Sequence, residues 1–306
     1  FSMVPLNLSR PERRSADYLD TGHWSVKAIK EANRLLDHAA VVASSREQGY
    51  RGIPPEDTWA CRDQAAYLHY TPNETIQGVE FHSVPTPPEG VPLVADMSSN
   101  MLSRPFDVAR FGLIYAGAQK NIGPAGLTLV IVRQDLIGQA QPGTPLLYDY
   151  AAYATSQSMI NTPPTLAWYA AALVFRWLLD QGGLSVIEAR NQRKAALLYD
   201  CIDQSGGFYR NAVEPAARSR MNIPFTLIDP ALDPSFLDQA AARGLLNLKG
   251  HRAVGGMRAS LYNAMPEEGS PVWSISCRIS PAPTVPEQPD STGGPQGGPD
   301  ALWEMH

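Results

Sequence analysis

Residues 95–126 read ADMSSNMLSRPFDVARFGLIYAGAQKNIGPAG, and this stretch predicts how the chain around it folds. It places Asp96 at the end of the apolar segment VPLVAD and Lys120 just after a second one, FGLIYAG. Residues at the carboxyl ends of strands in an α/β sheet meet in a shared crevice, so we expect these two side chains to lie together. Nearby glycines would let a flat ligand approach Lys120. Burial would lower the pKa of its amine, so that the neutral amine could form a Schiff base. The plainer alternative is a surface lysine and an aspartate that caps a turn.

The composition is that of a globular chain without a polyanionic partner. Of the 306 residues, 44% are hydrophobic and 18% are charged, which suffices for one large and one smaller domain. A net charge of −5 with no basic stripe argues against nucleic acid as a partner. The longest apolar runs, LTLVIV and LAWYAAALVF, are too short to span a bilayer, so we expect no membrane partner. Three scattered cysteines without a CxxC pair favour a cytoplasmic location and no metal site.

The periodicity predicts an α/β architecture with a mostly parallel central sheet. The segments ADYLDTG, AVVASS and AAYLHY are typical of strands, and WSVKAIKEANRLL is typical of an amphipathic helix. GLTLVIV predicts a further buried strand, and LAWYAAALVFRWLLDQGG predicts a long buried helix that ends at Gly182. After it we expect a second helix, LSVIEARNQRKAALLYDCIDQ, and then a strand (MNIPFTLID), a helix (PSFLDQAAARG) and two strands around a glycine-rich turn.

These segments group into two domains and a tail. We expect a large domain over residues 1–181 and a small α+β domain over residues 182–280. Residues 281–306 are dense in Pro, Gly and Ser and cannot bury a core face, so we expect them to be disordered.

Several motifs resemble, in order, those of the phosphoserine aminotransferases, which are pyridoxal phosphate (PLP) enzymes of fold type I. The motifs are NETIQG (73–78), DMSSN (96–100), SRP (103–105), FGLIYAGAQKNIGPAG (111–126), NTPP (161–164) and KGHRAVGGMRAS (249–260). The resemblance covers roughly residues 1–269. It implies a PLP fold type I large domain, a PLP cofactor, and amino transfer between phosphoserine with 2-oxoglutarate and 3-phosphohydroxypyruvate with glutamate, in serine biosynthesis. It also implies a homodimer with shared active sites.

The resemblance assigns a role to each matched residue. Lys120 would hold the cofactor as a Schiff base and move the substrate proton, and Asp96 would pair with the protonated pyridine nitrogen. The other implied contacts to the cofactor are Trp24 stacked on the ring, Thr75 at its phenolic oxygen, and Ser98 and Gln119 at its phosphate, with Asn161 and Thr162 lent to the partner's cofactor. Arg258 would bind the substrate α-carboxylate, while His251 and Arg252 would reach the substrate phosphate in the neighbouring subunit.

Each of these residues also has a plainer interpretation. A tryptophan at a helix start is usually a packing residue, and PNET is also typical of a turn followed by a helix cap. Thr162 would cap a helix whose first turn holds Pro163 and Pro164. The charges of residues 249–258 would belong to a solvated turn. His23 departs from the residue types usual in the family, and no role follows for it.

The two ends of the chain depart from the family pattern. About the first fifth is absent, including a glycine-rich turn that would hold the cofactor phosphate, and the resemblance stops after Gly269. We therefore expect weak cofactor retention and little turnover from this chain alone. The alternatives are another fold type I enzyme, such as a desulfurase or a glyoxylate aminotransferase, and a non-catalytic partner of a full-length subunit. The lack of a cysteine on an obvious active-site loop argues against the desulfurase.

Overall fold

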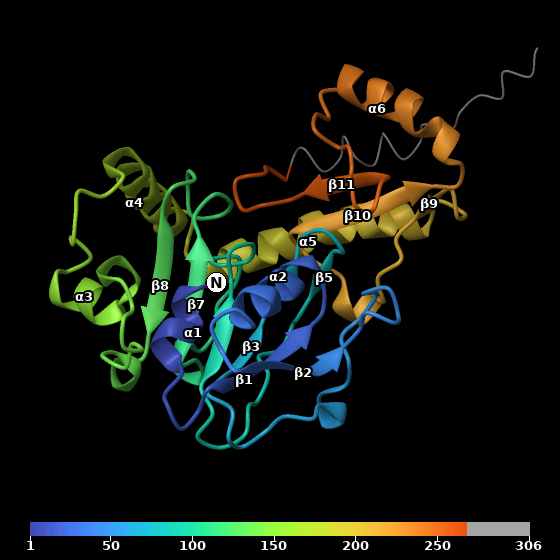
Figure 1. Cartoon of the computed structure of the whole chain (residues 1–306). Coiled ribbons are helices and arrows are strands. Elements are labelled where there is room, and N and C mark those ends of the chain that lie inside the picture. Colours follow the sequence, from blue (N-terminus) through green and yellow to red (C-terminus); the bar gives the residue numbers. More distant parts are fainter. Residues whose placement is uncertain (268–306) are drawn as a thin grey trace, which may run out of the picture.

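A six-stranded sheet forms the centre of the structure, a computed structural model that describes residues 1–267 (Figure 1). Its spatial order is β2-β1-β3-β6-β7-β8, and all neighbours pair in parallel except β7 and β8. The strands are β1 (Ser15–Asp20), β2 (His38–Ser44), β3 (Leu68–Tyr70), β6 (Leu93–Asp96), β7 (Leu113–Gly117) and β8 (Thr128–Val132). The predicted α/β class with a mostly parallel sheet is confirmed.

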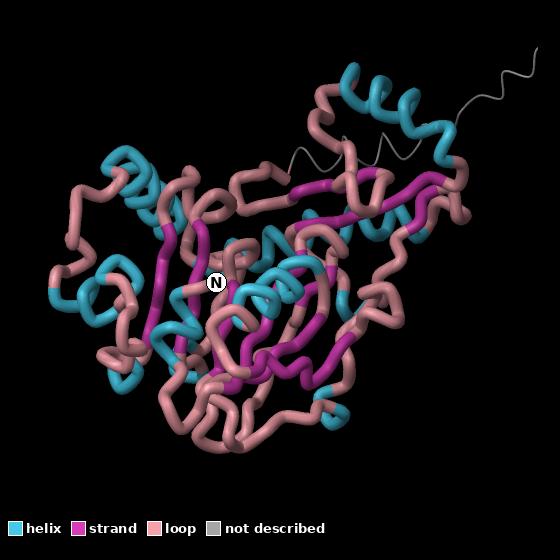
Figure 2. Tube along the Cα trace, viewed as in Figure 1, coloured by secondary structure: helices cyan, strands magenta, loops and turns pink. Residues whose placement is uncertain are grey.

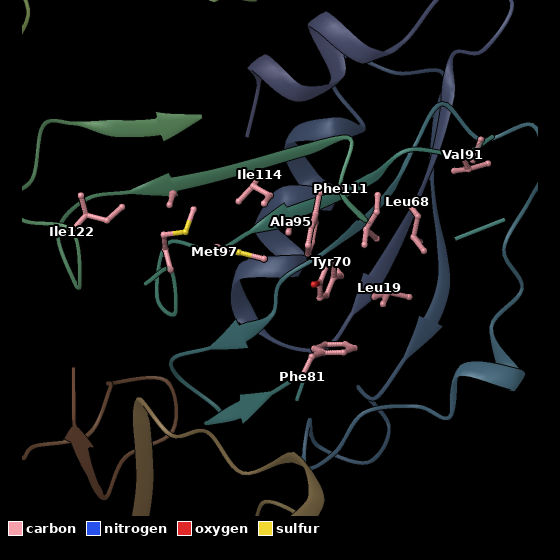
Figure 3. Close-up of a cluster of buried hydrophobic side chains, with 14 of the residues drawn as sticks. Leu19, Leu68, Tyr70, Phe81, Val91, Ala95, Met97, Phe111, Ile114 and Ile122 are labelled. Carbon is pink, nitrogen blue, oxygen red and sulfur yellow. The ribbon is translucent and has the colours of Figure 1, made fainter. Parts of the chain in front are cut away.

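Both faces of the central strands are buried, which explains why these segments are apolar at nearly every position. Successive side chains of a strand point to opposite faces, so Ile114 of β7 packs in one cluster while Leu113 and Tyr115 pack in the other. Figure 3 shows the first cluster, where Leu68, Ala95 and Ile114 come from three adjacent strands.

Two helices cover the second face. They are α1 (Met3–Leu8) and α2 (His23–Ala32), which bury Val4, Leu8, Ala28 and Ala32 against Tyr18 and its neighbours in the sheet. The segments expected to form the first strand and the amphipathic helix therefore do so. Between β2 and β3 the chain runs mostly as loop, as Figure 2 shows.

Two segments that we expected to be buried are not. The strand β8 lies at the sheet edge, and Thr128 and Ile131 are exposed. The helix α4 (Thr165–Asp180) buries only Ala167, Ala171 and Leu178, and the side chain of Leu166 is 78% exposed. An apolar run becomes buried only where another element covers it, and in the described residues only the face of α4 with Ala167, Ala171 and Leu178 is covered.

A second unit follows α4 in the chain and packs its own core. Its elements are α5 (Leu184–Asp203), β9 (Tyr209–Arg210), β10 (Asn222–Leu227), α6 (Asp233–Ala242) and β11 (Met257–Ser260), with β10 central in a three-stranded antiparallel sheet. Gly244 follows α6 with a φ of 83°, as expected for the residue after a helix end. Of the two strands predicted around the glycine-rich turn, only β11 forms, and Lys249 makes an isolated bridge to Met257.

Several short elements complete the described residues. They are the hairpin β4 (Asn73–Glu74) and β5 (Val79–Glu80), the helix α3 (Tyr150–Thr155), and the 3-10 helices η1 (Glu56–Thr58), η2 (Val108–Arg110), η3 (Gln134–Leu136), η4 (Leu146–Tyr148), η5 (Pro215–Ala217) and η6 (Pro230–Leu232). No single described helix is long and apolar enough to cross a bilayer. The helices α4 and α5 meet that criterion only as a pair bent by 86°.

The predicted domain boundary falls in the turn between α4 and α5, and the division at residue 181 stays a prediction. The helix α5 also contacts the first unit, because Asn191 Nδ2 donates to the carbonyl oxygen of Ser103 at 3.1 Å. The predicted disordered tail, and the part of the small domain beyond residue 267, lie outside the described residues.

A buried lysine ties α5 to the chain that follows β11. Lys194 Nζ donates to the carbonyl oxygens of Leu261 (3.1 Å), Tyr262 (2.9 Å) and Met265 (3.1 Å). Burial, with Arg190 adding to it, lowers the pKa of Lys194 to about 8. The three carbonyl oxygens favour the ammonium form, so the group is charged at neutral pH and its charge is matched by hydrogen bonds.

Replacing Lys194 by methionine should lower the free energy of unfolding by about 2–4 kcal/mol, because it leaves three carbonyl oxygens without their donor. Urea unfolding at pH 7 measures this. Lys30→Met, at an exposed position of α2, is the control. Equal unfolding midpoints for the two variants would contradict the structural role of Lys194.

Candidate active site

A cleft of about 220 Å³ opens where β6 and β7 end. Asp96 is the last residue of β6 and pairs in register with Tyr115 of β7, while Lys120 follows β7 after a tight turn. The residues that line the cleft are Phe1, Trp24, Thr71, Asn73, Asp96, Ser98, Ser99, Tyr115, Gly117, Gln119, Lys120 and Thr128. The predicted convergence of Asp96 and Lys120 on one crevice is therefore present in the structure.

Asp96 is a buried carboxylate whose donors come from the next turn. Its Oδ1 accepts hydrogen bonds from the Ser98 backbone N–H at 3.0 Å and from Ser98 Oγ at 2.6 Å. Burial raises the pKa of the Asp96 carboxyl above its ordinary value, and these hydrogen bonds and the charge of Lys120 oppose that shift. The site therefore contains a buried carboxylate, to which a cationic partner would bind strongly.

The amine of Lys120 loses its proton more readily than that of a surface lysine, because its pKa is lowered. Its backbone N–H donates to the carbonyl oxygen of Ala118 at 2.7 Å, which closes the turn after β7. Burial lowers the pKa of the Lys120 amine, Asp96 opposes this shift, and Arg258 adds to it. A lysine with a lowered pKa beside a cleft can act as a nucleophile or a base.

Trp24 lines the same cleft and contacts Thr75, although 51 residues separate them. The indole Nε1 of Trp24 donates to Thr75 Oγ1 at 2.9 Å, which orients the ring. The amine nitrogens of Lys120 and Lys27 lie 5.7 Å and 4.6 Å from the ring centroid of Trp24. The tryptophan thus forms an aromatic wall beside Lys120, where a flat conjugated ring could stack.

Glu74 orients Trp24 and was missed by the sequence analysis. Its two carboxylate oxygens accept the backbone N–H groups of Trp24 and Ser25, both at 2.8 Å, at the start of α2. The expected helix cap at PNET therefore exists in another form, because Glu74 lies in β4 and caps a distant helix. Burial raises the pKa of Glu74 to about 7. A Cβ on Gly22 would lie 2.5 Å from Glu74 Cδ, so the close approach needs a glycine there.

Asn73 joins the cleft to the second unit. Its Nδ2 donates to Ser99 Oγ at 2.8 Å and to Asn222 Oδ1 at 3.0 Å, and its Oδ1 accepts from Ser219 Oγ at 2.6 Å. Asn222 begins β10. The NET motif therefore connects three segments, because Asn73 reaches the second unit, Glu74 caps α2 and Thr75 holds the indole.

The residues predicted to bind the cofactor phosphate lie in different places. Ser98 and Gln119 line the cleft, and Gln119 is exposed. Asn161 and Thr162 are exposed ahead of α4 and do not line the cleft of their own chain. The alternative in which Thr162 caps a helix is wrong, because α4 has Pro164 at its N-cap.

The residues predicted to bind the substrate do not line the cleft itself, and we call them the rim: His251, Arg252 and Arg258. Arg258 Nη1 donates to the carbonyl oxygen of Thr75 at 3.3 Å, and the His251 ring lies 6.0 Å from the His23 ring, which itself meets Trp24 edge-on. Arg252 is exposed on the same turn. His23, which had no expected role, therefore lies between Trp24 and His251, and burial lowers the pKa of its ring.

Tyr115 and His69, which the sequence did not single out, form a pair beneath the cleft. Tyr115 lines the cleft, and its hydroxyl is 2.9 Å from His69 Nε2. Burial lowers the pKa of His69 to about 3, so the ring is neutral at physiological pH. Nothing in the sequence separates these residues from ordinary strand residues, because only the pairing of β3, β6 and β7 places them below Asp96.

Comparison with known proteins gives a consistent family. A family profile, "Aminotransferase class-V", matches residues 1–269. The phosphoserine aminotransferase of Laribacter hongkongensis is 59% identical over 269 residues, which are 88% of this chain and 74% of the relative. That of Hahella chejuensis is 57% identical over 88% of this chain and 73% of the relative.

Solved structures agree with these relatives. A phosphoserine aminotransferase from Bacillus circulans subsp. alkalophilus has a TM-score of 0.87 and 44% identity, over 90% of this chain and 76% of that one. A PLP-bound phosphoserine aminotransferase from Trichomonas vaginalis has a TM-score of 0.84 and 40% identity, over 90% and 78%. An alanine–glyoxylate aminotransferase from Nostoc sp. matches at 16% identity with a TM-score of 0.67, over 90% and 78%, which shows a shared fold alone.

The pKa of Glu74 predicts a pH dependence of stability. In the folded chain Glu74 keeps its proton up to about pH 7, whereas in the unfolded chain it loses the proton near its ordinary pKa of 4.5. The folded state therefore binds more protons between these values, and this group makes stability fall as pH rises from 4.5 to 7, by up to about 3 kcal/mol.

Urea unfolding of the native chain and of Glu74→Gln from pH 4.5 to 7.5 measures that contribution. The difference in unfolding free energy between the two proteins should shift against the native chain as pH rises. Glu89→Gln makes the same change at an exposed position and serves as the control. A difference that stays constant with pH would show that Glu74 does not retain its proton in the folded state.

Proposed function

Since the chain belongs to the class-V aminotransferases, and within them to the phosphoserine aminotransferases, we propose that its cleft transfers an amino group with PLP as cofactor. The substrates are O-phospho-L-serine with 2-oxoglutarate and 3-phosphohydroxypyruvate with glutamate. The observation that carries the proposal is that Asp96 and Lys120 meet in one cleft beside Trp24. We place the reaction in serine biosynthesis in the cytoplasm.

The residues of the cleft fit the cofactor. Trp24 offers an aromatic wall, Asp96 a buried carboxylate, and Lys120 an amine with a lowered pKa. When bound, PLP supplies a conjugated ring that accepts the electrons released at the substrate Cα. Asp96 would pair with the ring nitrogen and keep it protonated, because a buried carboxylate favours a cation next to it. Thr75 Oγ1, which accepts the indole N–H of Trp24, would bind the phenolic oxygen of the cofactor.

Lys120 is the residue that moves the substrate proton. When neutral, its amine would take the proton from the substrate Cα, and as an ammonium group it would hold that proton for return. Burial favours the neutral amine, and the charge of Asp96 keeps its pKa from falling far. Closure of the cleft by substrate would exclude water and strengthen both effects.

The rim selects a substrate with two anionic ends. Arg258 lies against the carbonyl oxygen of Thr75 and so stands next to the cofactor, where its guanidinium can bind the α-carboxylate in two parallel hydrogen bonds. We assign the substrate phosphate to His251 and Arg252, which extend from the glycine-rich turn and act in the neighbouring subunit. A Cβ on Gly250 would lie 2.0 Å from the carbonyl oxygen of Gly255, so this turn requires glycine.

A homodimer would complete this arrangement. The exposed face of α4 carries large apolar side chains, namely Leu166, Tyr169, Leu173, Phe175 and Leu179. Monomeric proteins rarely leave such a stripe in water, so we assign it to a subunit interface. Asn161 and Thr162 come directly before this helix, and a partner docked on α4 would bring them to its cofactor phosphate. Gln119 would donate to the same phosphate from within the subunit.

Addition of PLP followed by borohydride should attach the cofactor to Lys120 alone among residues 1–267. Lys27 is the sharpest competitor, because its amine also lies over Trp24. Peptide mapping should find the label in the native chain and in Lys27→Met, and should find none in Lys120→Met. Label on another lysine, or undiminished label in Lys120→Met, would overturn the assignment of Lys120 and with it the proposed reaction.

In a full-length context, replacing Arg252 by alanine should impair phosphoserine far more than serine as amino donor. A lost charge-assisted hydrogen bond predicts a fall in kcat/KM for phosphoserine of about 10- to 100-fold, because such a bond contributes about 1.5–3 kcal/mol. Arg258→Ala is the control and should impair both donors alike, since both carry the α-carboxylate. Equal losses for both donors in Arg252→Ala would show that Arg252 does not bind the phosphate.

The double variant Leu166→Glu with Tyr169→Glu should shift the chain from dimer toward monomer. Two carboxylates in an apolar interface would raise the dissociation constant at least about tenfold, because each would have to be desolvated. Sedimentation analysis over a concentration series measures this. Leu197→Glu, at an exposed apolar position of α5, should leave the distribution unchanged. An unaltered dimer in the double variant would place the interface elsewhere.

A further inference from the structure

Ser98 makes three hydrogen bonds that tie together the ends of β6 and β7. Its Oγ donates to Asp96 Oδ1 at 2.6 Å, its backbone N–H donates to the same oxygen at 3.0 Å, and its Oγ accepts the backbone N–H of Gly117 at 3.0 Å. We propose that Ser98 is a positioning residue that orients Asp96 toward the cofactor ring, and that it does not bind the cofactor phosphate. This rests on the proposed function, in which Asp96 pairs with the ring nitrogen.

The hydroxyl of Ser98 can donate only one hydrogen bond. A serine hydroxyl has a single hydrogen to donate, and here it points to Asp96. A phosphate dianion accepts hydrogen bonds and donates none at neutral pH, so Ser98 Oγ could bind it only by withdrawing that hydrogen from the carboxylate. Because Asp96 is 5% exposed, the loss would leave a buried charge short of a donor. The Asp96 carboxylate is therefore the preferred acceptor for the Ser98 hydroxyl, in place of a phosphate.

The hydrogen bonds from Ser98 reach only one of the two carboxylate oxygens of Asp96. Both Ser98 donors go to Oδ1 of Asp96, and no described residue donates to Oδ2. The carboxylate is thus held by one oxygen while the other remains available in the cleft. The bond from Gly117 fixes Ser98 Oγ in turn, since Gly117 is the last residue of β7 and its backbone cannot move without the sheet. Gly117 thus holds Ser98, and Ser98 orients the Asp96 carboxylate that would contact the ligand.

The adjacent serine shows that residue type alone does not produce this arrangement. Ser99 also lines the cleft, but its Oγ donates to the carbonyl oxygen of Asn73 at 2.8 Å and accepts from Asn73 Nδ2. Among the described residues Ser99 makes no hydrogen bond with Asp96, and its side chain is buried against the NET motif. Ser99→Ala is therefore a matched control for Ser98→Ala, with the same chemical change one residue away.

The experiment compares two ligands that differ only in the phosphate. Dissociation constants of PLP and of pyridoxal are measured spectroscopically for the native chain, Ser98→Ala, Ser98→Thr and Ser99→Ala, and inorganic phosphate is titrated as a competitor. If Ser98 orients Asp96, Ser98→Ala should weaken PLP and pyridoxal by the same factor, about tenfold, and leave competition by phosphate unchanged. Ser98→Thr, which keeps the hydroxyl, should restore both affinities.

The same measurements in the background of Asp96→Asn test whether Ser98 acts through the carboxylate. There, Ser98→Ala should change the affinity for pyridoxal less than about twofold, because the group that it orients is already altered. A loss confined to PLP, together with weaker competition by phosphate, would overturn the proposal and make Ser98 a phosphate ligand. An undiminished effect of Ser98→Ala in Asp96→Asn would overturn it as well.

These outcomes are distinguishable from failure of the proposed function. If Lys120 is not labelled by PLP and borohydride, the reaction itself is wrong. If Lys120 is labelled and Ser98→Ala acts on the phosphate alone, only the role of Ser98 is wrong. Far-ultraviolet circular dichroism of each variant shows whether it is folded, and Ser98→Thr provides the comparison should Ser98→Ala be unstable.

Discussion

The parallel pairing of β6 with β7 is the constraint on which the site depends. It sets Asp96 opposite Tyr115 and ends both strands at the same edge of the sheet. A slip of one residue would turn Asp96 to the other face and bury its neighbour in its place. The register is held because both faces of the sheet are packed, and because Ser98 bonds the end of one strand to Gly117 at the end of the other.

Burial acts on the two reactive groups in opposite directions. It raises the pKa of the Asp96 carboxyl and lowers that of the Lys120 amine, since each charged form loses its hydration. Their mutual attraction opposes both shifts. Burial therefore favours the neutral form of each group, while their attraction favours the charged forms. Beneath them, Tyr115 and His69 form a buried hydrogen-bonded pair that is neutral at physiological pH.

The NET motif shows how a short peptide can set the geometry of three distant elements. Asn73 holds the second unit, Glu74 caps α2, and Thr75 fixes the Trp24 indole. A shift of this hairpin would move the aromatic wall, the helix and the second unit together. Because Arg258 also donates to the carbonyl oxygen of Thr75, the substrate-binding rim is tied to the same hairpin.

The sequence by itself determined the class of fold, the strand ends that carry Asp96 and Lys120, and the family. The fold class and the strand ends follow from local pattern, since apolar runs predict strands and strand ends predict a crevice, whereas the family follows from the resemblance of the motifs. It did not determine the burial of α4 or β8, because an apolar run does not reveal whether another element covers it. Only the tertiary structure decided that Glu74 caps a helix begun 51 residues earlier, at His23, that His69 lies beneath the cleft, and that Ser98 donates to Asp96. Each of these depends on segments that come together only when the sheet is assembled, so no spacing in the sequence records them.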